Sequence, residues 1–151
     1  MRAATYSRNQ SGMLLIEALV AIVIFSVGIL ALIGLQAKAI SLNTDAQYRA
    51  DAAILANQLI GRLAVAAPAS AASFAHRASG STLCAPSGSD STEPTVTDWL
   101  REVNATLPGA DTSKQQITID TTNNVVVVTL CWKANGGTTH NNVVTTQMQW
   151  Q

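Results

Sequence analysis

Few side chains in this sequence are placed to do chemistry, and those few lie far apart. His76 and His140 lack the spacing of metal ligands, and His76 is expected to be a solvated surface residue. Asp98 and Glu102 are four residues apart on a predicted short, exposed helix, where two carboxylates are expected to be solvated. The sequence contains no nucleophile-elbow, phosphate-binding-loop or zinc-protease motif. We therefore predict a protein that is not an enzyme and that needs no metal or cofactor.

Glu17 is the one charged residue in an apolar run that extends from Gly12 to Leu35, GMLLIEALVAIVIFSVGILALIGL. A helix of this length can cross a hydrocarbon core of roughly 30 Å. A carboxylate there costs on the order of 2.5–3.5 kcal/mol on insertion scales, so we expect it to have a partner or a function. The alternative is an ordinary signal anchor in which Glu17 reaches the headgroups. A cleaved secretory signal fits less well, because its apolar region spans only about 7–15 residues and no A-x-A site follows here.

These features resemble the class III signal of type IV prepilins. A short basic leader, residues 1–12, ends at Gly12; the apolar helix follows, with Glu17 at the fifth position after the leader. The resemblance implies that a prepilin peptidase cuts between Gly12 and Met13 and methylates the new terminus at Met13. Members of the family usually begin with Phe; Met13 keeps a large apolar residue, so we expect processing to survive. In a filament, Glu17 is then expected to meet the Met13 amine of a neighbouring subunit and to set the axial register.

Topology follows from the charges of the leader. Arg2 and Arg8 precede the span and are expected to stay on the cytoplasmic side of the inner membrane, which places the rest of the chain in the periplasm. In that oxidising compartment Cys84 and Cys131 are expected to form a disulfide that stabilises the fold by roughly 4 kcal/mol in the chain-entropy model. Two free buried thiols are the alternative. A redox or metal pair has no support, because no C-x-x-C motif is present.

The helix is predicted to continue beyond the apolar run and to end before Pro68. Residues 36–67 contain no proline, and their apolar residues recur at steps of three or four, which indicates one apolar stripe. Asp45 and Arg49 are spaced to form an ion pair on this helix. The predicted organisation is a cleaved leader, an apolar segment, an amphipathic segment and a periplasmic domain, at residues 1–12, 13–35, 36–67 and 68–151.

The periplasmic domain is predicted to begin with a loop and a short helix. Residues 68–94 are rich in Ala, Ser, Gly and Pro and are interpreted as a surface loop with Phe74 and Leu83 as apolar anchors. A helix is expected from Thr97, whose side chain would cap it, to the Pro-Gly pair at 108–109. Trp99 lies on its apolar face and is predicted to be a core residue.

Three strands are predicted to follow. QQITID at 115–120 alternates, VVVVTLCW at 125–132 is apolar on both faces and should be central, and VVTTQMQW at 143–150 should be an edge strand. Turns are expected at 122–124 and at Asn135-Gly136. Val144, Met148 and Trp150 share the face that should close over the amphipathic helix. The predicted fold is α+β and pilin-like, with a long N-terminal helix packed on a small antiparallel β-meander.

The charge balance excludes one class of partner. The chain has 9 Lys and Arg against 9 Asp and Glu, and loss of the leader removes two of the arginines. No basic run or patch is present, so binding of nucleic acid through a charged surface is unsupported.

Three further features resemble the minor pilins of the PilV type: GILALIGLQ after MLLIEALVA, a short helix that carries Trp99 and ends in Leu-Pro-Gly, and the strand VVVTLCW. The resemblance implies assembly with other minor and major pilins in a priming complex, and a place near the filament tip beside a tip adhesin. A minor pseudopilin of type II secretion is the first alternative. A membrane-tethered periplasmic binding module, in which Glu17 is incidental, is the second.

Overall fold

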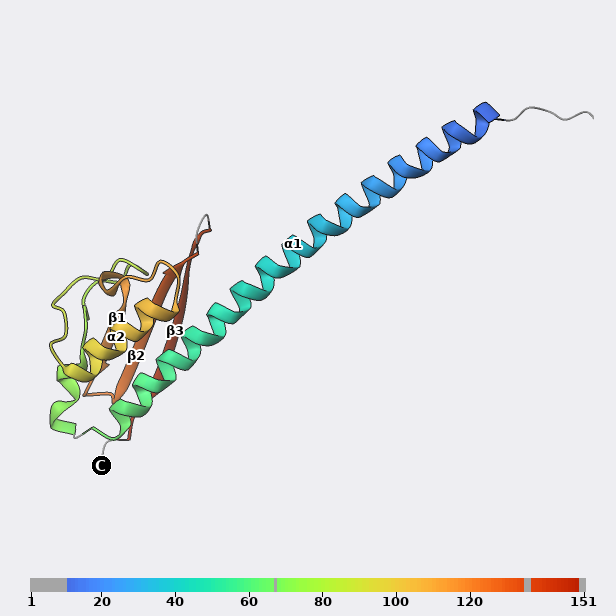
Figure 1. Cartoon of the computed structure of the whole chain (residues 1–151). Coiled ribbons are helices and arrows are strands. Elements are labelled where there is room, and N and C mark those ends of the chain that lie inside the picture. The colour runs from blue at the N-terminus through green and yellow to red at the C-terminus, as the bar shows by residue number, and fades with distance from the viewer. Residues whose placement is uncertain (1–10, 67, 135–136, 150–151) are drawn as a thin grey trace, which may run out of the picture. The chain divides into compact units, whose positions relative to one another are not determined.

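The computed structural model describes residues 11–66, 68–134 and 137–149. The chain divides into two compact units, residues 1–44 and residues 45–151. Helix α1 begins in the first unit and ends in the second (Figure 1). The elements in chain order are α1 (Ser11–Ala64), η1 (Pro68–Phe74), α2 (Pro94–Thr106), η2 (Thr112–Lys114), β1 (Gln116–Asp120), β2 (Val125–Lys133) and β3 (Thr139–Gln147).

Helix α1 is the long N-terminal helix that the sequence predicts, and it is continuous through Gly28 and Gly34. It ends at Ala64, slightly earlier than the expected end at Ala67, which itself lies outside the described residues. Pro68 disfavours the helical conformation in the residue before it, so the helix must stop short of that position. From Ala52 to Leu63 the apolar stripe of α1 is buried in the second unit.

The sheet is an antiparallel meander with the order β1-β2-β3, so the central strand is β2, as predicted (Figure 1). The strand β2 is buried on both faces from Thr129 to Trp132. The edge strand β3 alternates between exposed and half-buried residues, as predicted, but begins at Thr139, four residues before the expected start at Val143. Three residues after the turn were predicted to close over the helix. Val144 and Met148 contact the core, as predicted, and Trp150 lies outside the described residues.

The turn between β1 and β2 is held by Asp120. Its carboxylate accepts hydrogen bonds from the backbone N–H groups of Thr122 and Asn123 and from the side-chain amide of Asn123. These bonds, the side-chain one first, hold the pKa of Asp120 below its ordinary value. The turn predicted at 122–124 is therefore confirmed, whereas the one predicted at Asn135-Gly136 lies outside the described residues.

Helix α2 packs its apolar face into the core, as predicted. Trp99 is 0% exposed, and its Nε1–H donates to the Leu55 carbonyl of α1 at 2.8 Å. The expectation that Thr97 caps this helix is wrong: the N-cap is Glu93, which makes no side-chain cap, and Pro94 occupies the first turn. Proline is pre-organised for that position, so the helix starts three residues earlier. The buried core combines residues of α1, η1, α2 and the sheet: Ala52, Leu55, Ala56, Leu59, Leu63, Phe74, Val96, Trp99, Leu100, Val103, Leu107, Ile117, Val126, Val128, Leu130, Trp132 and Met148.

The segment between α1 and α2 is more ordered than the predicted surface loop. It contains η1 and two isolated bridges, His76 with Ile117 of β1 and Ser79 with Ser87. Phe74 is buried, as expected, but Leu83 is 57% exposed, so its assignment as an anchor was wrong. The adjacent Cys84 supplies the attachment through a covalent bond, and Leu83 is left facing solvent.

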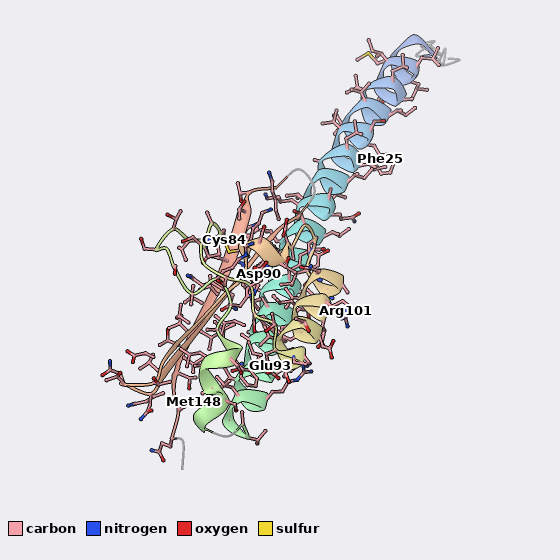
Figure 2. The ribbon with its side chains drawn as sticks, turned by 90° about the vertical axis from the view of Figure 1, so that its left-hand side faces the viewer. Phe25, Cys84, Asp90, Glu93, Arg101 and Met148 are labelled. Atoms are coloured by element: carbon pink, nitrogen blue, oxygen red, sulfur yellow. A yellow bond between two sulfur atoms is a disulfide. The ribbon has the colours of Figure 1, made fainter. Side chains whose placement is uncertain are left out.

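A disulfide joins Cys84 of this loop to Cys131 of β2, as expected from the sequence (Figure 2). Beside it, the buried Gln115 side chain pairs with the main chain of Cys131: the Cys131 N–H donates to Gln115 Oε1 at 2.7 Å, and Gln115 Nε2 donates to the Cys131 carbonyl at 2.9 Å. The disulfide therefore links the loop to β2, and the buried hydrogen bonds of Gln115 link the residue before β1 to the same position of β2.

We predict that the double substitution Cys84→Ser/Cys131→Ser lowers the free energy of unfolding by roughly 4 kcal/mol, because the bridge closes a loop of 47 residues in the unfolded chain. Denaturant unfolding of the full chain in detergent, followed by near-ultraviolet circular dichroism, measures the change. Reduction of the wild type should reproduce it. Equal unfolding midpoints for the oxidised and reduced chain would contradict the prediction.

Candidate functional site

The first unit presents a continuous apolar surface. Every side chain from Met13 to Asn43 is exposed, including the large apolar ones such as Phe25, which projects from the helix in Figure 2. The most apolar window of α1 has a mean hydropathy of 2.9 and no buried residue, and by length and composition this helix can cross a membrane. A helix that is apolar on all sides is stable in lipid or among other apolar helices. This part of α1 is therefore the candidate site for membrane insertion and assembly.

Glu17 is the charge that this segment must accommodate. Its side chain is exposed, and in the described ranges no ion pair includes it. The other charged residue among 11–44 is Lys38, which lies 21 residues further along the helix, about 30 Å away at 1.5 Å per residue. A cation for Glu17 must therefore come from outside the described part of this unit.

The remaining polar and small residues of the segment behave differently. The Ser26 hydroxyl donates to the Ile22 carbonyl at 2.7 Å, so its polar group is satisfied within the helix. A Cβ added at Gly28 or Gly34 would meet nothing within 4 Å among the atoms described. No contact within the described ranges thus requires glycine at either position. Small residues in membrane helices permit close approach of a second helix. A loosening of the helix at Gly34 within a filament stays a prediction.

His76 is not the solvated residue that the sequence led us to expect. It is 1% exposed, and both ring nitrogens have main-chain partners: Nδ1 accepts from the Ser91 N–H at 3.1 Å, and Nε2 donates to the Thr112 carbonyl at 3.0 Å. These partners fix the neutral Nε2–H tautomer. The neighbouring Arg77 pairs with Asp90. The partners are 15 and 36 residues away in sequence, so no local pattern indicated the burial.

His140 takes part in a second cluster, which joins β3 to the last part of α1. The predicted pair of Arg49 with Asp45 is formed at 3.0 Å, and His140 adds Nε2 at 3.4 Å from Asp45 Oδ1 and Nδ1 at 3.3 Å from Arg49. Its ring stacks on Trp132 with centroids 5.8 Å apart. Two of these groups are on the helix and two on the sheet, so the cluster is a packing contact between elements of the second unit.

The carboxylates of α2 are separated by their partners. Asp98 pairs with Arg101 at 2.9 Å, and Glu102 pairs with Arg62 of α1 at 3.6 Å. Asp98 and Arg101 are largely exposed, and Arg62 and Glu102 are less than half exposed; surface pairs of this kind contribute about 0–1 kcal/mol. Among the residues that the structure describes, no group of three or more His, Cys, Asp or Glu side chains is arranged to hold a metal ion.

Of the residues assigned to processing and assembly, Gly12 and Met13 lie in the first turns of α1 and Glu17 one turn further along, while Arg2 and Arg8 are outside the described residues. Comparison of the chain with protein-family models, curated proteins and solved structures gives no match.

We predict that His76→Ala lowers the free energy of unfolding by about 2–4 kcal/mol, because it leaves the buried Ser91 N–H without a partner and removes a ring that is 1% exposed from the packed interior. His140→Ala is the matched control: its ring is partly exposed, its polar contacts are solvent-accessible, and we expect a loss of about 1 kcal/mol. Denaturant unfolding of both variants measures the difference. Similar losses for the two histidines would contradict the structural role assigned to His76.

Proposed function

We propose that this chain is a minor subunit of a type IV pilus. In this proposal a prepilin peptidase removes residues 1–12 and methylates Met13, the apolar segment holds the subunit in the inner membrane, and the same segment then packs among the helices of other pilins. The observation that carries the proposal is Glu17, a carboxylate with no described cationic partner on a helix that is apolar all round.

The energetics of Glu17 favour assembly over simple anchoring. A charge left unpaired among packed apolar helices destabilises the assembly by about 3–5 kcal/mol relative to a satisfied pair. Removal of the leader would take away Arg2 and Arg8, and it would create a free amine at Met13, one turn before Glu17. The amine of a neighbouring subunit is the cation that makes this carboxylate tolerable. Each subunit would then supply one acid and one base, and the pairing would fix the axial offset between neighbours.

The second unit is suited to the outside of such a filament. It has its own core, a long-range disulfide and a largely polar edge strand, β3, and a disulfide is stable in the periplasm and on the cell surface. The place of the subunit near the filament tip, and its partners, namely other minor and major pilins and a tip adhesin, rest on the resemblance to PilV-type minor pilins.

The proposal is tested by Glu17→Ala. We expect this variant to insert into the membrane at least as well as the wild type, because it removes a cost of about 2.5–3.5 kcal/mol, and to enter sheared filaments at least about tenfold less. Immunoblots of membrane and sheared fractions, normalised to the major subunit, measure both effects. Glu17→Gln should behave as Glu17→Ala does, because it keeps the size of the side chain and loses the charge.

Ser26→Ala is the matched control, because it removes a polar group that is already satisfied within the helix. We expect it to enter filaments as the wild type does. Equal incorporation of Glu17→Ala and wild type would contradict the proposal. If deletion of the chain impairs secretion of folded proteins and leaves piliation intact, the subunit belongs to a secretion pseudopilus.

A further inference from the structure

Among the described residues, the edge of the sheet without any main-chain partner is that of β3. The other edge is paired at Ile117 of β1, which exchanges two main-chain hydrogen bonds with His76 of the preceding loop. Across the part of the chain that the structure describes, no strand or loop pairs with the outer side of β3. An edge of this kind carries a row of unpaired N–H and C=O groups.

The hydrogen bonds identify which residues of β3 face outwards. Met148, just after the strand, donates its N–H to the Asn124 carbonyl. Every second residue before Met148 therefore also points its main-chain N–H and C=O groups towards β2. The main-chain hydrogen bonds of Ile117 lead to the same assignment. Its N–H and C=O bond to His76 and therefore point away from β2, so the main-chain groups of Val128, which lies opposite Ile117, point towards β3 and bond to Val144. The outward-facing residues of β3 are therefore Thr139, Asn141, Val143, Thr145 and Gln147, and all five side chains are exposed.

This edge lacks the devices that usually block strand addition. Proteins protect exposed edges with lysine, proline, bulges or very short strands. The strand β3 has nine residues, THNNVVTTQ, and contains no proline, lysine, arginine or carboxylate. Its histidine, His140, lies near one end of the strand. The register of β3 with β2 is unbroken. Its exposed face is centred on Val143, which is 46% exposed.

We propose that the outer edge of β3 binds an extended, uncharged segment of another protein, which adds a fourth strand to the sheet. The unpaired main-chain groups determine the class of ligand, since they are satisfied by another extended backbone. The absence of charged side chains along the edge favours an uncharged ligand, because an acidic or basic segment would find no ion-pair partner there. Val143 favours an apolar or β-branched residue opposite it.

A second copy of the chain is a poorer occupant. A twofold β3–β3 pairing is antiparallel, and its axis reverses the direction of residues 45–64 of α1, which lie on the same sheet (Figure 1). In such a pair residues 45–64 of the two copies would run in opposite directions, whereas the subunits of one filament all point the same way along it. This step rests on the proposed filament, whereas the strand-binding edge itself does not.

The probe is a fluorescent peptide of about seven residues with alternating Thr and Val, N-methylated at alternate residues so that only one of its edges can pair. The control peptide is methylated at every residue. We expect the probe to bind the full chain in detergent micelles and the control not to bind. Because the edge is uncharged, the affinity should change little between about 0.1 M and about 1 M salt.

Two readouts locate the binding. Amide exchange by nuclear magnetic resonance should slow at least about tenfold at Val143 and Thr145, whose N–H groups face outwards, and not at Val144 and Thr146, which already bond to β2. Val143→Pro removes the outward N–H and should weaken binding at least about tenfold, whereas Val143→Ala removes only the side chain and should weaken it by less than about threefold.

The exchange measurement uses the wild type, so the test stands even if Val143→Pro fails to fold. No binding of the probe, equal binding of the fully methylated peptide, or protection outside β3 would overturn the proposal. Light scattering that shows dimers of the wild type, abolished by Val143→Pro without any peptide, would also overturn it by making a second copy the occupant. None of these outcomes depends on whether Glu17 directs filament assembly.

Discussion

A carboxylate on a helix segment that is apolar on every side limits what that segment can do. The segment around Glu17 has no buried face, so it is stable only in lipid or among similar helices, and within the described residues of its unit the other charge is about 30 Å away. In the pilus subunit that we propose, the charge has a function. A carboxylate that is tolerable near the headgroups becomes costly in a packed bundle of helices unless a neighbouring subunit neutralises it.

The second unit is held together by contacts between segments distant in sequence. The disulfide attaches the loop after α1 to β2, and His76 joins the same loop to Thr112 through its ring and to Ile117 of β1 through its main chain. The side chain of Gln115 joins the segment before β1 to β2. No comparable segment covers β3 among the described residues, so the attachments on one side of the sheet leave the other as the open edge.

The periodic features of the fold could be predicted from the sequence, and the long-range ones could not. The helix, the central strand β2, the alternating β3 and the buried Trp99 follow from patterns over a few residues. The pattern around Thr97 predicts a start of α2 that is three residues too late, because Pro94 is better suited to the first turn. The burial of His76 was missed because its partners Ser91 and Thr112 are remote in sequence, and the exposure of Leu83 was missed because the neighbouring disulfide anchors the loop. The outward-facing residues of β3 needed the hydrogen-bond register, which the sequence does not contain.

The most direct test of the central claim is mass spectrometry of the N-terminus of the chain, taken from membranes and from sheared filaments. We expect a chain that starts at N-methylated Met13 in the sheared fraction, because only a free amine at that position gives Glu17 of a neighbouring subunit its partner. A chain that keeps Met1 and remains in the membrane would contradict the proposed role of Glu17 and leave a tethered periplasmic domain.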